Sequence, residues 1–194
     1  MRGFNPHAVV TFGGYPGFAP SFAASLIGAK VIMIEQNSIP GLANKLIYPL
    51  AKSVILNYAY TKKWFKKGVV IGNPVNPKIG KVEKRKAIEH FGLDKKKKTD
   101  LVFGGSQGAI GLNKVILLTL GKLKEFNILW SCGRKNHDLL KNAPEISKAK
   151  HVRLLPFIEE MEYAWAAADV VVSRSGASTI SEMRASRVPG VLVP

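Results

Sequence analysis

The sequence predicts an α/β protein made of two Rossmann-like, parallel-sheet domains. Short apolar runs alternate with helix-like stretches along all 194 residues, which is the pattern of βαβ units. Small-residue turns follow three of these runs, at 12–15, 104–108 and 175–178. A turn-rich break at 72–77 separates two such alternations, so we place the domain boundary at Asn76, with domains at 1–76 and 77–194.

Each element follows from a local pattern. In the first domain, compact apolar runs predict strands at 8–12, 30–34, 53–56 and 69–71, with helices from the Gly13-Gly14 turn to Leu26 and at 42–51. In the second, helices are expected at 81–91, 109–123, 159–168 and 179–185, and strands at 101–103, 127–130, 152–155, 169–173 and 190–193. The sequence starts just before one strand and stops just after another, so both domains are expected to be truncated.

Charge and composition narrow the classes of partner. Lysine and arginine total 29 against 13 acids, a net charge of +16 that favours nucleic acid, an anionic membrane surface or phosphorylated substrates. No recognised nucleic-acid motif is present, so a nucleic-acid partner is not expected. No apolar run reaches the roughly 20 residues of a membrane helix, so membrane contact is expected to be peripheral. The run Lys95–Lys98 is interpreted as a solubilising linker.

The residue pattern gives little support for a metal site or for a catalytic nucleophile. The four histidines are scattered, and no Asp-x-Asp pair follows a strand, so neither a metal nor a cofactor is expected. The single cysteine, Cys132, excludes an intramolecular disulfide and is interpreted as a small core residue. The serines lie in small-residue turns without a matching histidine and aspartate.

The three small-residue turns point instead to a phosphorylated ligand. A strand-to-helix turn leaves backbone N–H groups free at the positive end of the helix dipole, where a phosphate binds readily. Three such turns in one chain indicate a nucleotide or diphosphate, although each is also compatible with a tight turn that merely needs glycine.

At five motifs the chain resembles a known family. They are FGGY at Phe12–Tyr15, EQN at Glu35–Asn37, GNPV at Gly72–Val75, GGSQGA at Gly104–Ala109 and RSGASTISE at Arg174–Glu182. In order and spacing these motifs resemble the central part of the MurG family of peptidoglycan glycosyltransferases. The resemblance implies the two-domain GT-B fold and metal-independent, inverting transfer of N-acetylglucosamine from UDP-GlcNAc, a substrate and not a cofactor, to undecaprenyl-diphosphate-muramoylpentapeptide. It also implies a peripheral location on the cytoplasmic face of the cell membrane.

Two alternatives remain open. The family's first glycine-rich loop and the carboxyl-terminal part of its donor domain have no counterpart here, and Asn76 stands where many members carry arginine. A UDP-sugar-binding remnant without transfer activity is one alternative. A related glycolipid glycosyltransferase is the other.

The resemblance also assigns site residues. It places Glu182 on the ribose hydroxyls and Gly13, Gly14 and Tyr15 beside the acceptor diphosphate. Glu35 is predicted as the catalytic base from its place at the carboxyl end of a strand that faces the expected cleft. The remaining substrate-binding residues that the resemblance implies are Asn37, Ser106, Gln107, Gly108, Ile158, Arg174, Ala177, Ser178, Thr179, Ile180 and Ser181.

Each assignment has a structural alternative. Glu182, expected in the first turn of its helix, is equally suited to capping that helix. Glu35 is equally suited to structural hydrogen bonding, Asn37 to an ordinary turn and Ile158 to the core. The stretch Tyr58–Lys67, in which lysines flank Trp64 and Phe65, suits either an anionic bilayer or a solvated lysine face over buried aromatic rings.

Overall fold

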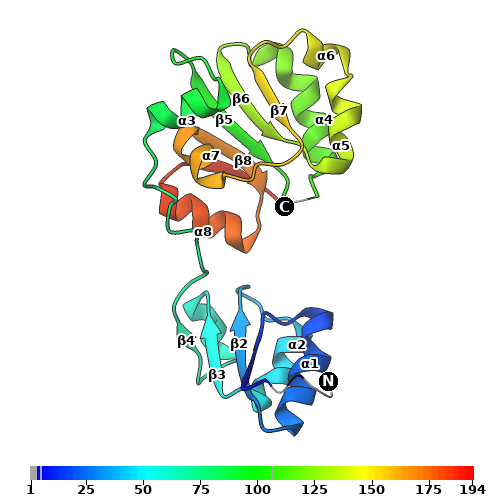
Figure 1. Cartoon of the computed structure of the whole chain (residues 1–194), viewed down its shortest axis with the longest axis vertical. Helices are drawn as coiled ribbons and strands as arrows, with labels where there is room; N and C mark the ends of the chain where they lie inside the picture. Colours follow the sequence, from blue (N-terminus) through cyan, green and yellow to red (C-terminus); the bar gives the residue numbers. More distant parts are fainter. Residues whose placement is uncertain (1–3, 5, 106) are drawn as a thin grey trace. The chain divides into compact units, whose positions relative to one another are not determined.

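The computed structural model describes residues 4, 6–105 and 107–194, which form two compact units, 1–74 and 75–194 (Figure 1). The division falls between Pro74 and Val75, two residues before the boundary expected at Asn76.

The N-terminal unit is a four-stranded parallel sheet in the order β1-β2-β3-β4. Its strands are β1 (Ala8–Thr11), β2 (Lys30–Glu35), β3 (Ser53–Leu56) and β4 (Val69–Val70). Its helices are α1 (Gly14–Leu26), α2 (Leu42–Ile47) and the 3₁₀ turns η1 (Tyr48–Leu50) and η2 (Ala59–Lys63). Alternate residues of β2 and β3 are buried, and with Ile47 and Phe65 they make the core on one face of the sheet.

The C-terminal unit is a five-stranded parallel sheet in the order β7-β6-β5-β8-β9. Its strands are β5 (Lys98–Phe103), β6 (Phe126–Ser131), β7 (Val152–Leu155), β8 (Val170–Arg174) and β9 (Gly190–Val193). Its helices are α3 (Lys84–Phe91), α4 (Ile110–Thr119), the 3₁₀ turn η3 (Leu120–Lys122), α5 (Arg134–Lys141), α6 (Pro144–Ser147), α7 (Met161–Ala167) and α8 (Ala177–Ser186).

Both faces of the central strand β5 are buried. Leu101 belongs to the core on the side of α3 and α7, and its neighbour Val102 to the core on the side of α4 (Figure 1). A strand covered on both faces reads as a continuous apolar run, which is what the sequence shows at Leu101–Phe103. This double cover holds the loops at the ends of β5 in place.

Several elements differ from the sequence prediction. The basic run Lys95–Lys98 is not a linker: Lys95 pairs with Glu89 at 2.7 Å, and β5 begins at Lys98. The helix expected from Lys81 begins at Lys84, because the backbone of Glu83 is extended, with a ψ of 131°, and Glu83 is the N-cap. The helices α5 and α6 were not predicted, since their exposed faces carry little apolar periodicity. None of the helices in the described residues is long and apolar enough to cross a bilayer.

Candidate functional site

The strand order of the C-terminal unit reverses at β5. The chain runs outward through β6 and β7, then crosses back to place β8 on the other side of β5. The last residue of β5, Phe103, lies opposite Ser173 of β8. The turns that follow these two strands, 104–109 and 175–176, therefore leave the same edge of the sheet side by side. In open parallel sheets, ligands bind in the crevice outside the carboxyl ends of the strands at such a reversal.

Both turns lead into helices whose amino ends carry no side-chain cap within the described residues. In α4 the first helical bond runs from the N–H of Asn113 to the carbonyl of Ala109 (2.9 Å), and in α8 from Ile180 to Gly176 (3.0 Å). The preceding N–H groups of each helix have no acceptor inside it. Neither helix has an acid in its first turn. Two positive helix ends thus flank the reversal, an arrangement suited to a diphosphate.

The loop before α4 is held by tight packing against the loop after β6. Gly108 has a φ of 75°, and a side chain there would collide with the carbonyl oxygen of Cys132. That oxygen accepts hydrogen bonds from the Nδ2 atoms of Asn113 (2.8 Å) and Asn136 (3.1 Å). Gly133, with a φ of 90°, packs equally closely against the backbone of Gln107. The glycine at position 108 is therefore required by the packing of the turn, whatever it binds.

This supporting network was missed by the sequence analysis. Asn113 also accepts a hydrogen bond from the indole N–H of Trp130 (3.1 Å), so both ends of its buried amide are used. The available signal was the Cys132-Gly133 pair directly after a strand, which marks a third strand-to-helix turn at the same edge.

Glu182 lies in the second turn of α8, not in the first turn as expected, because the helix already begins at Ala177. Its Oε2 accepts a hydrogen bond of 2.9 Å from the indole Nε1 of Trp165, which extends from α7. Burial raises the pKa of Glu182 above its ordinary value, and the bond from Trp165 acts in the opposite direction. The carboxylate therefore does not cap its own helix and keeps acceptor capacity for a ligand.

The other residues predicted on the donor side differ in how far they are exposed. Ser106 lies outside the described residues. Gln107, Arg174 and Ser178 are exposed, whereas Gly108, Ala177, Ile180 and Ser181 are half-buried and Thr179 is buried. Ile158 is 4% exposed and belongs to the core, so any contact it makes with a ligand would come from its backbone. The hydroxyl of Ser181 donates to the carbonyl of Ala177 (3.0 Å), within its own helix.

In the N-terminal unit, Gly13, Gly14 and Tyr15 form the start of α1. Gly13 is the N-cap with a φ of 78°, its N–H donates to Thr11 Oγ1 (3.1 Å), and no side chain caps the helix within the described residues. Tyr15 is 96% exposed. Gly14 and Tyr15, in the first turn of α1, present backbone N–H groups that have no acceptor inside the helix, at the carboxyl edge of β1.

Glu35 ends β2 and is 1% exposed. Its Oε1 accepts hydrogen bonds from the backbone N–H (2.9 Å) and side-chain Nδ2 (3.2 Å) of Asn37, and its Oε2 accepts one from Nδ2 of Asn44 (2.9 Å). This geometry favours the structural alternative for both Glu35 and Asn37. Their assigned roles in the reaction stay predictions.

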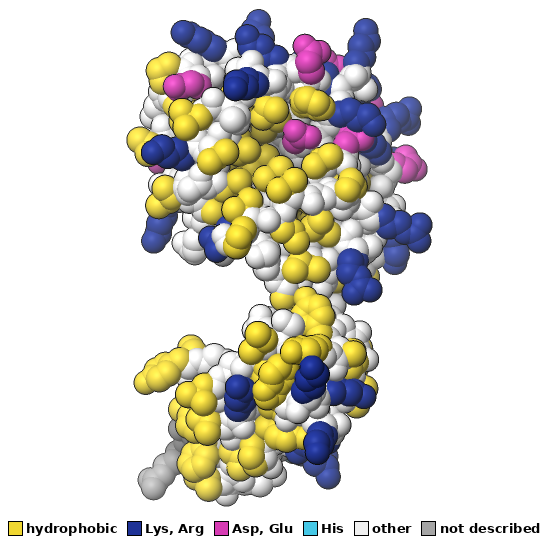
Figure 2. Space-filling view, turned by 180° about the vertical axis from the view of Figure 1, so that it is seen from behind, with side chains coloured by type: hydrophobic (Ala, Val, Ile, Leu, Met, Phe, Trp, Pro, Cys, Tyr) yellow, Lys and Arg dark blue, Asp and Glu magenta, His cyan; other side chains and the backbone are white. Residues whose placement is uncertain are grey.

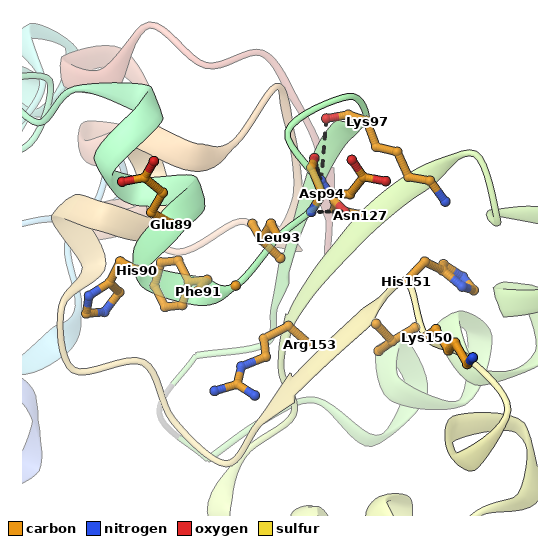
Figure 3. A pocket seen from close by; sticks show the side chains of 12 residues that line it. Glu89, His90, Phe91, Leu93, Asp94, Lys97, Asn127, Lys150, His151 and Arg153 are labelled. Carbon is orange, nitrogen blue, oxygen red and sulfur yellow. Dashed lines mark hydrogen bonds between the residues drawn. The ribbon is translucent and has the colours of Figure 1, made fainter.

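A separate hollow of ≈ 680 Å³ lies at the amino ends of β5, β6 and β7, at the other edge of the sheet from the small-residue turns (Figure 3). The basic side chains that line it diverge: Arg153 points to one side, and Lys97 and Lys150 point to the other (Figure 3). Groups that diverge do not enclose a small anion. The described residues also contain no cluster of three His, Cys, Asp or Glu side chains that would hold a metal ion.

Comparison with known proteins agrees with this geometry. Residues 1–56 match the glycosyltransferase family 28 N-terminal domain, and residues 99–194 match the glycosyltransferase family 28 C-terminal domain. A relative from Flavobacterium psychrophilum, named UDP-N-acetylglucosamine--N-acetylmuramyl-(pentapeptide) pyrophosphoryl-undecaprenol N-acetylglucosamine transferase, is 36% identical over 100% of this chain and 54% of its own. The chain thus spans about half the length of the curated relatives it matches.

Solved structures share the fold of this chain. MurG of Acinetobacter baumannii superposes with a TM-score of 0.68 at 28% identity, over 97% of this chain and 52% of that one. The UDP-GlcNAc 2-epimerase of Neisseria meningitidis bound to UDP-GlcNAc shares the fold, with a TM-score of 0.69 at 18% identity, over 98% of this chain and 60% of that one.

The two parallel α/β units, with small-residue turns at the carboxyl edge of each sheet, define a protein of the GT-B glycosyltransferase class. Within that class, the chain belongs to glycosyltransferase family 28.

Proposed function

We propose that the C-terminal unit binds the nucleotide of UDP-GlcNAc, with the diphosphate at the amino ends of α4 and α8 and the ribose on Glu182. The pair of uncapped helix ends beside the β5–β8 reversal carries this proposal. A carboxylate with one oxygen already fixed is suited to accept from two neighbouring hydroxyls.

We further propose that the chain serves the transfer named for its relatives, from UDP-GlcNAc to a lipid-linked muramoyl pentapeptide, with Gly13, Gly14 and Tyr15 beside the acceptor diphosphate. The exposed start of α1 supports this assignment. A transfer assay on a lipid-linked acceptor separates this activity from the alternative of a binding-only remnant, which would bind UDP-GlcNAc saturably without forming product.

The nucleotide site is tested by titrating UDP into the wild-type chain and into Glu182→Ala by calorimetry. Two hydrogen bonds to a charged group are lost, so affinity should fall about 100-fold. Glu145→Ala, which removes an exposed acid on α6, is the matched control and should bind like wild type. Unchanged affinity in Glu182→Ala would refute the proposed site.

We also propose that the N-terminal unit contacts an anionic membrane surface, on the cytoplasmic face of the cell membrane. Residues 1–74 contain one acid, Glu35, and that acid is buried. Their basic residues are Arg2, Lys30, Lys45, Lys52, Lys62, Lys63, Lys66 and Lys67. Lysine and apolar side chains lie next to one another on the face of this unit seen in Figure 2, where no acidic side chain is visible.

Part of the aromatic stretch is available for this contact. Tyr60 is 52% exposed with the Lys63 ammonium 4.0 Å from its ring centre, whereas Phe65 is buried in the core. Each lysine near an anionic surface contributes about 1 kcal/mol, so the triple change of Lys62, Lys63 and Lys66 to Gln should weaken binding to phosphatidylglycerol vesicles by about 100-fold in a sedimentation assay. The change of Lys122 and Lys124 to Gln in the C-terminal unit is the control. Equal binding to neutral and anionic vesicles would contradict the proposal.

A further inference from the structure

The carboxylate of Glu182 is held by a residue outside the small-residue turns. Trp165, in α7, is 1% exposed, and its indole Nε1 donates to Oε2 of Glu182 at 2.9 Å. The same ring meets Phe103 edge-on, with centres 5.8 Å apart. Phe103 is the last residue of β5, directly before the turn at 104–109. One buried ring thus contacts both the acid of α8 and the strand end that leads into α4.

We propose that Trp165 is a positioning residue that fixes the carboxylate of Glu182 for the ribose of a bound uridine nucleotide. The proposal rests on the proposed function of this site, and it adds a residue that the resemblance and the small-residue turns did not point to.

The geometry supports an orienting role. A glutamate has three rotatable side-chain bonds, so its carboxylate gains precision only when something holds it. The bond from Trp165 occupies one acceptor position of Oε2 and leaves the rest of the carboxylate open to donors. Because the indole is itself buried and packed against Phe103, it presents its N–H in one place.

Electrostatics give the same bond a second effect. Burial raises the pKa of Glu182, and the hydrogen bond from Trp165 lowers it. These are the two contributions found among the described residues. On α7 the other acid, Glu162, is engaged by Lys78 at 3.7 Å and by Asn76 at 3.3 Å, and on α8 Arg184 is exposed. The indole N–H is therefore the neighbour that favours the ionised form, which accepts from both ribose hydroxyls.

Trp165 is also a core residue, so the test must keep an aromatic ring in place. Trp165→Phe removes the N–H and retains most of the packing. UDP affinity, measured by calorimetry, should fall about tenfold at neutral pH, because a hydrogen bond to a charged group is lost. The pH dependence provides a readout that packing alone would not move. Affinity is lost as pH falls through the pKa of Glu182, and without the indole N–H this loss should begin at a higher pH.

Trp130→Phe is the matched control. Trp130 is also fully buried and also donates its indole N–H, but to Asn113 on the opposite face of the sheet. This variant should lose stability in a similar way, and some UDP affinity because Asn113 supports the turn before α4, while keeping the wild-type pH dependence of UDP binding.

A measurement on the unmodified chain covers the case in which Trp165→Phe does not fold. The chain has three tryptophans, so its NMR spectrum has three indole N–H resonances. The resonance of Trp165 should titrate with Glu182 and shift when UDP binds, whereas that of Trp64, in the other unit, should not.

Two results distinguish a failure of the role proposed for Trp165 from a failure of the proposed nucleotide site. If Trp165→Phe binds UDP with wild-type affinity and pH dependence while Glu182→Ala does not bind, the positioning role is wrong and the nucleotide site stands. If neither variant changes UDP affinity, the nucleotide site itself is wrong.

Discussion

The two units carry similar glycine turns on different sheet topologies. In the N-terminal unit the described strands follow one another across the sheet, β1-β2-β3-β4, without a reversal. In the C-terminal unit the order reverses at β5, so two helix ends leave neighbouring strands together. The motif Phe12–Tyr15 and the turn at 104–108 look alike in sequence, yet within the described residues only the second follows a strand at which the strand order of its own sheet reverses. Topology, more than glycine content, distinguishes the two sites.

The two candidate acids, Glu35 and Glu182, differ in how many of their carboxylate oxygens already accept hydrogen bonds from the protein. Glu35, which ends β2, and Glu182, in the second turn of α8, were both predicted as site residues, but Glu35 has both oxygens bound by Asn37 and Asn44. Glu182 has one oxygen bound, by Trp165, and its other oxygen is free of protein hydrogen bonds within the described residues. A carboxylate near the edge of a sheet is thus a ligand candidate only after its own hydrogen bonds are counted.

Charge separates the units as well. The N-terminal unit has eight basic residues and one acid, the buried Glu35. The C-terminal unit has the remaining 21 of the 29 basic residues and the remaining 12 of the 13 acids. Acids of the C-terminal unit form ion pairs, such as Asp169 with Lys84 at 2.7 Å. A surface with a large excess of positive charge suits an extended anionic partner. A surface on which positive and negative charges are nearer in number suits a small ligand at a defined place.

The largest effect that would test the difference between the turns is expected from Gly108→Ala. A left-handed φ and a collision with the Cys132 carbonyl together should cost about 3 kcal/mol of unfolding free energy. UDP affinity should fall with it, because the start of α4 must move. Urea unfolding and calorimetry measure the two effects.

Gly111→Ala is the matched control for that change. Gly111 lies in α4 with open space around its Cα, so alanine there should stabilise the helix by about 0.5–1 kcal/mol. Gly13→Ala, in the other unit, should also destabilise, because its side chain would strike Asn44, but it should leave UDP affinity unchanged. A loss of UDP affinity in Gly13→Ala would contradict the claim that UDP binds at the turns of the C-terminal unit and not at the turn before α1.

Much of the fold could be predicted because buried parallel strands are short apolar runs. The strands at 53–56, 152–155 and 190–193 were located to the residue. The helix α5 was missed because its sequence, Arg134–Lys141, is mostly polar, with Leu140 as its one buried residue. The strand order, and so the reversal at β5, depends on pairings between distant segments that local pattern does not encode.

The sequence predicted the turns of the candidate site but not the side chains that hold them in place. Glycine and serine after a strand are local signals, so the turns at 104–108 and 175–178 were found. The bond from Trp165 to Glu182 spans 17 residues, and Asn113 reaches the Cys132 carbonyl over 19. Such contacts arise only when α7 packs against α8 and α4 against the end of β6, so the local sequence pattern does not identify the residues that make them.

Smaller effects than that of Gly108→Ala, with opposite signs in the two units, are expected when each acid is replaced by glutamine. Glu35→Gln should destabilise by about 2 kcal/mol, because its new NH₂ group must face the Nδ2 of Asn44 or the donors of Asn37. A flip of the Asn44 amide would restore one contact, but it would take a donor away from the Ile34 carbonyl (3.3 Å). Urea unfolding at neutral pH measures the loss.

Glu182→Gln should act in the opposite direction. The pKa of Glu182 is raised in the folded state, chiefly by burial, so its contribution to stability is fully present below the unfolded-state pKa and is lost as pH rises through the folded-state pKa. Glutamine keeps the acceptor for Trp165 and avoids that loss, so the variant should unfold at a slightly higher temperature than wild type at neutral pH and at the same temperature in acid. If both variants were destabilised equally at neutral pH, the two acids would be structural groups of one kind, and the distinction between the units would fail.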